Sequence, residues 1–315
     1  MKKFLAIILI STASAVSAQQ ISLNSQYLFN DMLVNPGATG MKDYIPIQLS
    51  FRKQWTNFPG SPTTQALSSD ANVANNIGFG GTVFNDVAGP SRRTGINLNG
   101  AYHIKLERSS RHLLGLGLGF SLTQHAIDES KLKTYLPDDA AVLRGYNNTL
   151  VPDASFGIFY KFIDKGYVGL SAFNLVQTNR DLFDFQNGIY NPLVRTYYLY
   201  GGYNFDLSNT FRLKTSALVQ GIETVTVQFD VTTLLEYKKF FWFGFSYRHT
   251  DAVVAMIGGQ AGPVKFGYSY DYTLSDIGRY SSGSHEVFIE LQLSTKNSSS
   301  RTPWLKRNRI YSPKI

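Results

Sequence analysis

The side chains that could carry out chemistry in this chain are few and lie far apart. There are five histidines: His103, His112, His125, His249 and His285. They form neither an HExxH motif nor a close pair suited to zinc. The adjacent pair Ser284-His285 could suggest a hydrolase, but neighbours on a strand point to opposite faces. No cysteine is present, which excludes a thiolate metal site and a cysteine nucleophile.

One glycine-rich run could be read as a phosphate-binding loop. In residues 115–119, however, glycine alternates with leucine, as the two faces of a strand would, and no helix signal follows. A GxSxG nucleophile motif does not occur in the sequence. We therefore predict that the protein is not an enzyme, and we expect no metal and no cofactor.

Composition argues against an ordinary soluble protein and against a nucleic-acid partner. Charged residues make up 17% of the chain, below the roughly 25% of a typical soluble protein. The net charge is +8, but two of the 30 basic residues lie in residues 1–18 and six in 296–315, where no acid occurs. This leaves 22 basic residues against 22 acidic ones between those segments. A groove for nucleic acid would need basic residues clustered on the body.

The first 18 residues have the pattern of a cleaved signal peptide. Lys2 and Lys3 precede a short apolar run over residues 4–10, and Val16-Ser17-Ala18 ends the segment in small residues. The apolar run is shorter than the roughly 20 residues that a transmembrane helix needs. We expect cleavage after Ala18 and export of the mature protein.

The body of the chain alternates apolar and polar residues, which predicts strands. In the clearest segment one face carries Val264, Phe266, Tyr268, Tyr270 and Tyr272. A soluble β-sandwich would also alternate, but its apolar face would be a core rich in Val, Ile and Leu. Here the apolar faces often begin or end in Tyr or Phe, as the aromatic girdles of a membrane barrel do. We therefore predict an all-β fold, a transmembrane antiparallel β-barrel.

About fourteen strands are expected. The candidate segments lie near 44–55, 62–72, 76–86, 92–106, 111–126, 153–162, 166–176, 194–206, 210–220, 224–237, 240–249, 252–261, 263–273 and 284–294. An even count places both termini in the periplasm, with short turns on that side and long loops outside. The domain order would be a signal peptide (1–18), a periplasmic or lumen segment (19–43), the barrel (44–295) and a basic periplasmic tail (296–315). Inward glycines could leave room for the lumen segment or could relieve barrel curvature.

Sequence blocks spread over about residues 22–294 carry a resemblance to a known family. Their residues include Asn35, Pro36, Gly40, Gln54, Trp55, Gly60, Tyr268, Tyr270, Asp271, Tyr272, His285 and Glu286. On these blocks the chain resembles the PorP/SprF family, outer-membrane proteins associated with type IX secretion and gliding motility in Bacteroidetes. The resemblance implies a barrel needed for secretion or surface anchoring of large adhesins with a gliding-type C-terminal secretion domain. It also implies periplasmic type IX secretion or peptidoglycan-linked partners.

Two groups of residues are candidate partner contacts. The first is an external loop, Tyr280, Ser281, Ser282 and Gly283, and the second lies in the tail, Trp304, Arg307, Arg309 and Tyr311. The tail combines aromatic and basic side chains of the kind enriched at interfaces, although a solvated extension explains it too. The alternative function is an outer-membrane pore or substrate-specific channel, which the polar inward faces permit.

Overall fold

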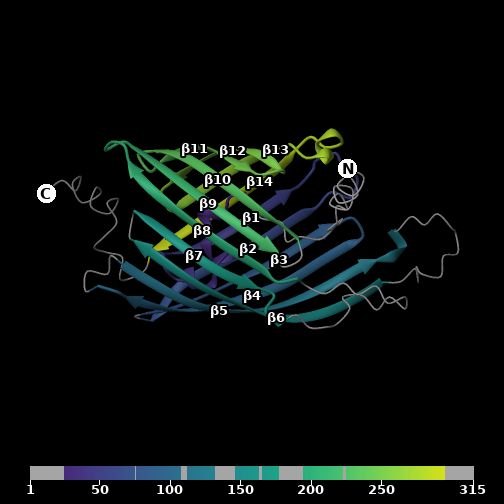
Figure 1. Cartoon of the computed structure of the whole chain (residues 1–315), viewed down its shortest axis with the longest axis horizontal. Coiled ribbons are helices and arrows are strands. Elements are labelled where there is room, and N and C mark those ends of the chain that lie inside the picture. The colour runs from purple at the N-terminus through teal and green to yellow at the C-terminus, as the bar shows by residue number, and fades with distance from the viewer. Residues whose placement is uncertain are drawn as a thin grey trace, which may run out of the picture.

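The chain forms a closed antiparallel barrel of fourteen strands in the residues that the computed structural model describes, 25–74, 76–107, 112–131, 146–162, 165–176, 194–222 and 225–294. The strands are β1 (Tyr44–Lys53), β2 (Thr63–Ala74), β3 (Ile77–Ala88), β4 (Ser91–Lys105), β5 (His112–Asp128), β6 (Tyr146–Phe162), β7 (Gly166–Phe173), β8 (Thr196–Asp206), β9 (Phe211–Ile222), β10 (Val225–Tyr237), β11 (Phe241–Arg248), β12 (Ala252–Ala261), β13 (Val264–Thr273) and β14 (Ser284–Ser294). Each pairs with its neighbours in sequence, and β1 pairs with β14 to close the wall (Figure 1).

The alternation of apolar and polar residues along the strands places apolar side chains on the outer face and polar side chains in the lumen, as predicted. A soluble protein has the opposite arrangement. In β11, Phe243, Phe245 and Tyr247 are exposed on the outer face, whereas Trp242 and Arg248 point inward and are buried. Apolar side chains on an outer face are stabilised by lipid, while inward polar groups find partners in the lumen. The predicted transmembrane β-barrel and its strand number are confirmed.

One predicted boundary was wrong. We expected the sixth strand to begin near residue 153, but β6 begins at Tyr146. Its first residues pair with the end of β5, from Asp128 opposite Tyr146 to Ala154 opposite Phe120, and β7 has no residues in register with them. Hydrogen bonds to β5 alone are enough to extend this hairpin. The prediction missed residues 146–152 because they lack the regular apolar alternation of a strand with a lipid-facing side.

The two ends of the barrel differ. At the turn end, defined by the start of β1 and the end of β14, the strands are joined by short connections such as 238–240 and 262–263. At the loop end lie the segments between β5 and β6 and between β7 and β8, together with 54–62 and 274–283. The helices within the described residues are 3-10 turns of three or four residues: η1 (Tyr27–Phe29), η2 (Asp31–Leu33), η3 (Pro36–Ala38), η4 (Glu129–Lys131) and η5 (Asp276–Arg279). None of them is long and apolar enough to cross a membrane.

Candidate functional site: a plugged lumen and its vestibule

Residues 25–43, here called the plug, run through the barrel before β1 begins. Ser25 contacts Asp271 and Glu286 near the loop end of their strands, and the chain reaches β1 at the turn end. Most plug side chains from Ser25 to Met41 are buried, although they precede the barrel wall in sequence. Figure 1 shows this purple segment surrounded by the strands. The lumen is therefore occupied by the chain's own N-terminal segment.

Strand glycines make room for the plug on one side of the lumen. The alpha carbons of Gly115, Gly117 and Gly157 face the turn η3, and a Cβ on any of them would clash with plug atoms. From the plug side, a Cβ on Gly37 would lie 2.9 Å from the carbonyl oxygens of Gly115 and Gly157. Backbone packs directly on backbone here, which only glycine permits. These inward glycines accommodate the plug, which is the first of the two readings that the sequence left open.

Asn35 fastens the plug to the same wall. Its side-chain oxygen accepts a hydrogen bond from Gly37 N (2.8 Å), which caps η3. Its amide nitrogen donates to the carbonyl oxygens of Ile158 (3.0 Å) and Leu170 (3.3 Å) on two strands. Asn35 is fully buried, so an unmade bond at this position would leave a desolvated polar group.

A buried charged network holds the start of the plug on the opposite side. Arg52 donates to Asp271 (2.7 Å), to Glu286 (2.9 Å) and to the Ser25 hydroxyl (2.9 Å). The Ser25 backbone N donates to Glu286 Oε2 (2.8 Å), the same oxygen that accepts from Arg52. Arg248 adds a bond to Ser25 Oγ (3.2 Å). All five side chains are at most 3% exposed, so their charges are compensated by one another and not by water.

An aromatic cluster lies deeper in the lumen. Phe29 of the plug packs against Trp242 and Phe288, with ring centroids 5.1 Å from each. The ammonium group of Lys265 lies 4.0 Å from the centroid of the Phe29 ring. The plug is thus held by apolar and cation–π contacts as well as by charge.

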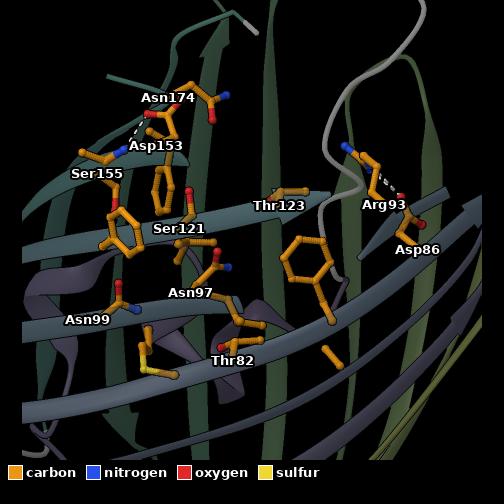
Figure 2. Close-up of a pocket in the computed structure, with 18 of the residues that line it drawn as sticks. Thr82, Asp86, Arg93, Asn97, Asn99, Ser121, Thr123, Asp153, Ser155 and Asn174 are labelled. Carbon is orange, nitrogen blue, oxygen red and sulfur yellow. Dashed lines mark hydrogen bonds and ion pairs between the residues drawn. The ribbon is translucent and has the colours of Figure 1, made fainter. Parts of the chain in front are cut away.

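Between the plug and the loop end lies a cavity, here called the vestibule. It encloses about 1450 Å³, a volume that includes the part open to solvent. Its floor is formed by the plug residues Tyr27, Met32, Leu33 and Val34, and its wall by strands β2 to β8. The wall carries the neutral polar side chains Thr82, Asn97, Asn99, Ser121, Thr123 and Ser155, while apolar groups make up more of the cavity surface than polar ones (Figure 2). Phe173 and Tyr198 add an apolar corner, where their rings meet edge to face at 5.6 Å.

The two carboxylates of the vestibule have different surroundings. Asp86 forms an ion pair with Arg93 and accepts a bond from Thr64 (2.7 Å), so both of its oxygens are used. Asp153 accepts bonds from the backbone N of Ala154 (2.6 Å) and of Val176 (3.1 Å), both through Oδ1. Its Oδ2 has no hydrogen-bond partner, and the residue is 3% exposed. In Figure 2 the two carboxylates lie on opposite sides of the cavity.

At the turn end, the ionic contacts are exposed. Lys165 donates to Asp206 (2.8 Å), and Arg212 donates to the other oxygen of the same carboxylate (2.6 Å). The hydrogen bond to Asp206 raises the pKa of the Lys165 ammonium group above its usual range. Both members of the Lys165–Asp206 pair have 41% of their side chains exposed, so water already solvates them.

Comparison with known families decides what this barrel is. The model of the type IX secretion system membrane protein PorP/SprF matches residues 16–291, which is most of the chain. The chain belongs to the PorP/SprF family. The predicted membership is therefore confirmed, and the protein is an outer-membrane β-barrel of the type IX secretion system family. Comparison with curated proteins finds no match.

Solved structures show the same type of barrel at low sequence identity. The P. putida toluene transporter TodX is 11% identical, with a TM-score of 0.51, over 84% of this chain and 94% of that one. The Ralstonia pickettii toluene transporter TbuX is 8% identical, also with a TM-score of 0.51, over 90% of this chain and 97% of that one. At these identities the likeness concerns the fold alone.

Some of the residues on which the sequence resemblance rested lie in the plug or in the buried network. Asn35, Pro36 and Gly40 lie in the plug, where Gly40 N donates to Asp70 (2.7 Å) and Gly40 has a φ of 73°. Asp271 and Glu286 belong to the buried network around Ser25. Sequence blocks that are more than 200 residues apart are therefore joined through the plug.

The remaining motif residues build the loop end and the outer face. Gln54, Trp55 and Gly60 lie between β1 and β2, and the backbone N of Trp55 donates to Ser284 Oγ (3.1 Å). On the outer face, the Tyr268 hydroxyl and His285 Nδ1 are 2.7 Å apart. Tyr272 is exposed there as well.

The candidate loop of residues 280–283 is tied to the loop between β1 and β2. Ser282 N donates to Thr56 O (2.8 Å), and Gly283 O accepts from Thr56 N (2.8 Å). Tyr280 is 73% exposed, whereas Ser281 Oγ is buried and lacks a hydrogen-bond partner. The other candidate contacts, Trp304, Arg307, Arg309 and Tyr311, lie outside the described residues, as do the signal peptide and the basic tail.

Ser25, Asp230 and Asp153 are among the residues of this site that sequence reasoning missed. Nothing in the sequence around Ser25 marks it as a hydrogen-bond partner of two carboxylates. Asp230 accepts a hydrogen bond from Arg248 (3.3 Å), its cross-strand neighbour on β11. In the sequence, Asp230 is marked only by its position on the polar face of an alternating strand. Many inward residues share that position, so it does not identify Asp230 as part of the site.

Proposed function

We propose that this protein is a non-catalytic outer-membrane partner of exported adhesins, which it helps to secrete or to anchor through protein–protein contacts. The loop end would face the cell exterior and receive the adhesin, which would carry a gliding-type C-terminal secretion domain. The turn end and the basic tail would face the periplasm and contact type IX secretion or peptidoglycan-linked components. Membership of the PorP/SprF family supports each of these partners.

The observation that carries the proposal is the occupied lumen. A diffusion pore needs an open water-filled path, whereas here the plug packs backbone to backbone against strand glycines. It is also hydrogen-bonded to buried charged residues of the wall: Arg52, Asp70, Arg248, Asp271 and Glu286. Such packing favours a barrel that presents surfaces at its two ends. The pore remains the alternative function, since the inward faces of the strands are polar.

The first experiment is affinity purification of the tagged full-length protein from outer membranes in mild detergent, with mass spectrometry of the proteins recovered. We expect a large secreted protein with a C-terminal secretion domain in near-stoichiometric amount. Recovery of the barrel alone, combined with stable single-channel conductance in planar bilayers, would overturn the proposal in favour of a pore.

Two variants test the predicted contact surfaces. Tyr280→Ala removes an exposed side chain without breaking the backbone bonds that hold its loop, and it should weaken adhesin recovery. A chain that ends at residue 295 should lose its periplasmic partners but keep the adhesin. If both variants recover every partner as the wild type does, neither surface is a contact.

A further inference from the structure

The vestibule contains one carboxylate that its own surroundings leave incomplete. Asp153 Oδ2 is buried and unpartnered, while Oδ1 is held by two backbone N–H groups. Those two bonds fix the side chain in place within the wall of the cavity, where Figure 2 shows it beside Ser155 and Asn174. A buried acceptor of this kind is costly unless a donor reaches it.

The charge balance of the vestibule points to a cationic donor. Its other carboxylate, Asp86, is neutralised by Arg93. Among the described residues, no lysine or arginine pairs with Asp153. A cationic group that enters from the loop end would supply the donor that Oδ2 lacks. A carboxylate–ammonium or carboxylate–guanidinium bond is stronger than a neutral one, which would favour such a group.

The lining of the vestibule suits an extended polypeptide segment that carries a long side chain. The cavity is partly open to solvent, and the residues of its wall lie in the loop-end halves of their strands, so such a segment would enter from the loop end. Asn97, Asn99 and Ser121 offer both donors and acceptors, as the amide groups of an extended chain require. Phe173 and Tyr198 provide an apolar surface for the methylene groups of a long side chain.

We propose that the vestibule binds an extended segment of the exported partner, which inserts a lysine or arginine side chain toward Asp153. This inference rests on the proposed function, because it assigns to the adhesin a site inside the mouth of the barrel. It adds the location of the contact and the chemistry of the residue recognised. The contacts at the exposed loops would then guide the segment into the vestibule.

Site-specific crosslinking in producing cells tests the location. A photoreactive phenylalanine analogue replaces Thr123 in the vestibule wall or, as the control, Thr250 in the exposed turn between β11 and β12. We expect a crosslink to a secreted polypeptide from position 123 and little from position 250. The crosslinked peptide should contain a lysine or arginine near the attachment point.

Asp153→Asn tests the chemistry with little change in shape. The asparagine oxygen can still accept the bonds from Ala154 N and Val176 N, while the charge is lost. We expect the crosslink yield from position 123 to fall at least tenfold. Asp276→Asn is the matched control, since that carboxylate lies at the loop end and is 98% exposed. Heat-modifiable migration on gels verifies that both variants fold.

A titration of the purified full-length protein provides a readout that does not depend on the partner. Nα-acetyl-arginine amide should bind with saturation, its neutral analogue Nα-acetyl-citrulline amide should not, and Asp153→Asn should weaken arginine binding at least tenfold. Equal binding of the two probes would overturn the inference. So would a crosslink from position 123 to a glycan or lipid, or a partner that co-purifies but crosslinks only from position 250, which would leave the proposed function intact. If no partner co-purifies at all, the proposed function fails, and the titration alone decides whether Asp153 binds a cation.

Discussion

On the side of the lumen formed by β1, β11, β13 and β14, buried charged side chains bind the plug. On the side formed by β3, β5 and β6, glycines in the strands let the backbone of the plug pack directly against the wall. Arg52 and Arg248 face Asp271 and Glu286 around Ser25, all buried. On the other side, strand glycines allow the backbone of residues 35–40 to touch the wall. The charged contact depends on side chains of opposite charge, whereas the glycine contact depends on the absence of side-chain atoms between the two backbones.

This difference determines how each contact can be damaged and repaired. A buried ion network fails when one member is removed, because the remaining charges lose their compensation. Removing the remaining charges as well should restore stability. A glycine contact fails when any atom is added, and no nearby substitution makes the backbone smaller. Substitutions on the two sides should therefore differ in whether a second change rescues them.

The largest effect is expected from Arg52→Ala. It leaves the carboxylates of Asp271 and Glu286 buried without their main counter-charge, which should lower the free energy of unfolding by about 3–5 kcal/mol. Urea unfolding of the protein in detergent micelles measures this change. The triple variant Arg52→Met, Asp271→Asn, Glu286→Gln should recover most of the loss. A triple variant as unstable as Arg52→Ala would show that charge is not what holds this side of the plug.

Gly115→Val should have the next largest effect. The new side chain would collide with the carbonyl of Gly37 and with Met41, and overpacking of this kind costs about 3 kcal/mol. The matched control is Gly100→Val, because a Cβ on Gly100 has no atom within 4 Å. Urea unfolding should separate the two variants. In planar bilayers, only Gly115→Val should give conductance, as a displaced plug opens the lumen, and a silent but destabilised variant would contradict that reading.

Asn35→Ala should cost less, about 1–2 kcal/mol, because it removes hydrogen bonds without inserting atoms. The bonds lost are those from Gly37 N and to the carbonyls of Ile158 and Leu170. Asn35→Asp keeps the acceptor for Gly37 but turns the donor into a second acceptor, so it should be no more stable than the alanine variant. If Asn35→Asp matches the wild type in urea unfolding, the amide donor contributes nothing.

The barrel wall was predictable from sequence and the site largely was not, for a physical reason. Alternation with period two is a local signal, and a lipid-facing strand such as residues 264–273 expresses it at every position. The plug has no such period. Its residues are placed by contacts with wall residues that are distant in sequence, such as Asp70 for Gly40 and Ile158 for Asn35. The glycines at 115 and 117 signalled that space existed, but only the structure shows what fills it.

The smallest effect is expected from Lys165→Ala, which tests whether burial gives the charged side its strength. Lys165 and Asp206 form an ion pair as short as those of Arg52, but water solvates both partners, so removal should leave the urea midpoint unchanged within error at neutral pH.

The hydrogen bond to Asp206 raises the pKa of Lys165. Any contribution is therefore fully present below the ordinary lysine pKa and is lost as pH rises through the raised value. Wild type and variant should converge at strongly alkaline pH. A loss at neutral pH as large as that of Arg52→Ala would mean that ion pairing alone, without burial, accounts for the hold on the plug.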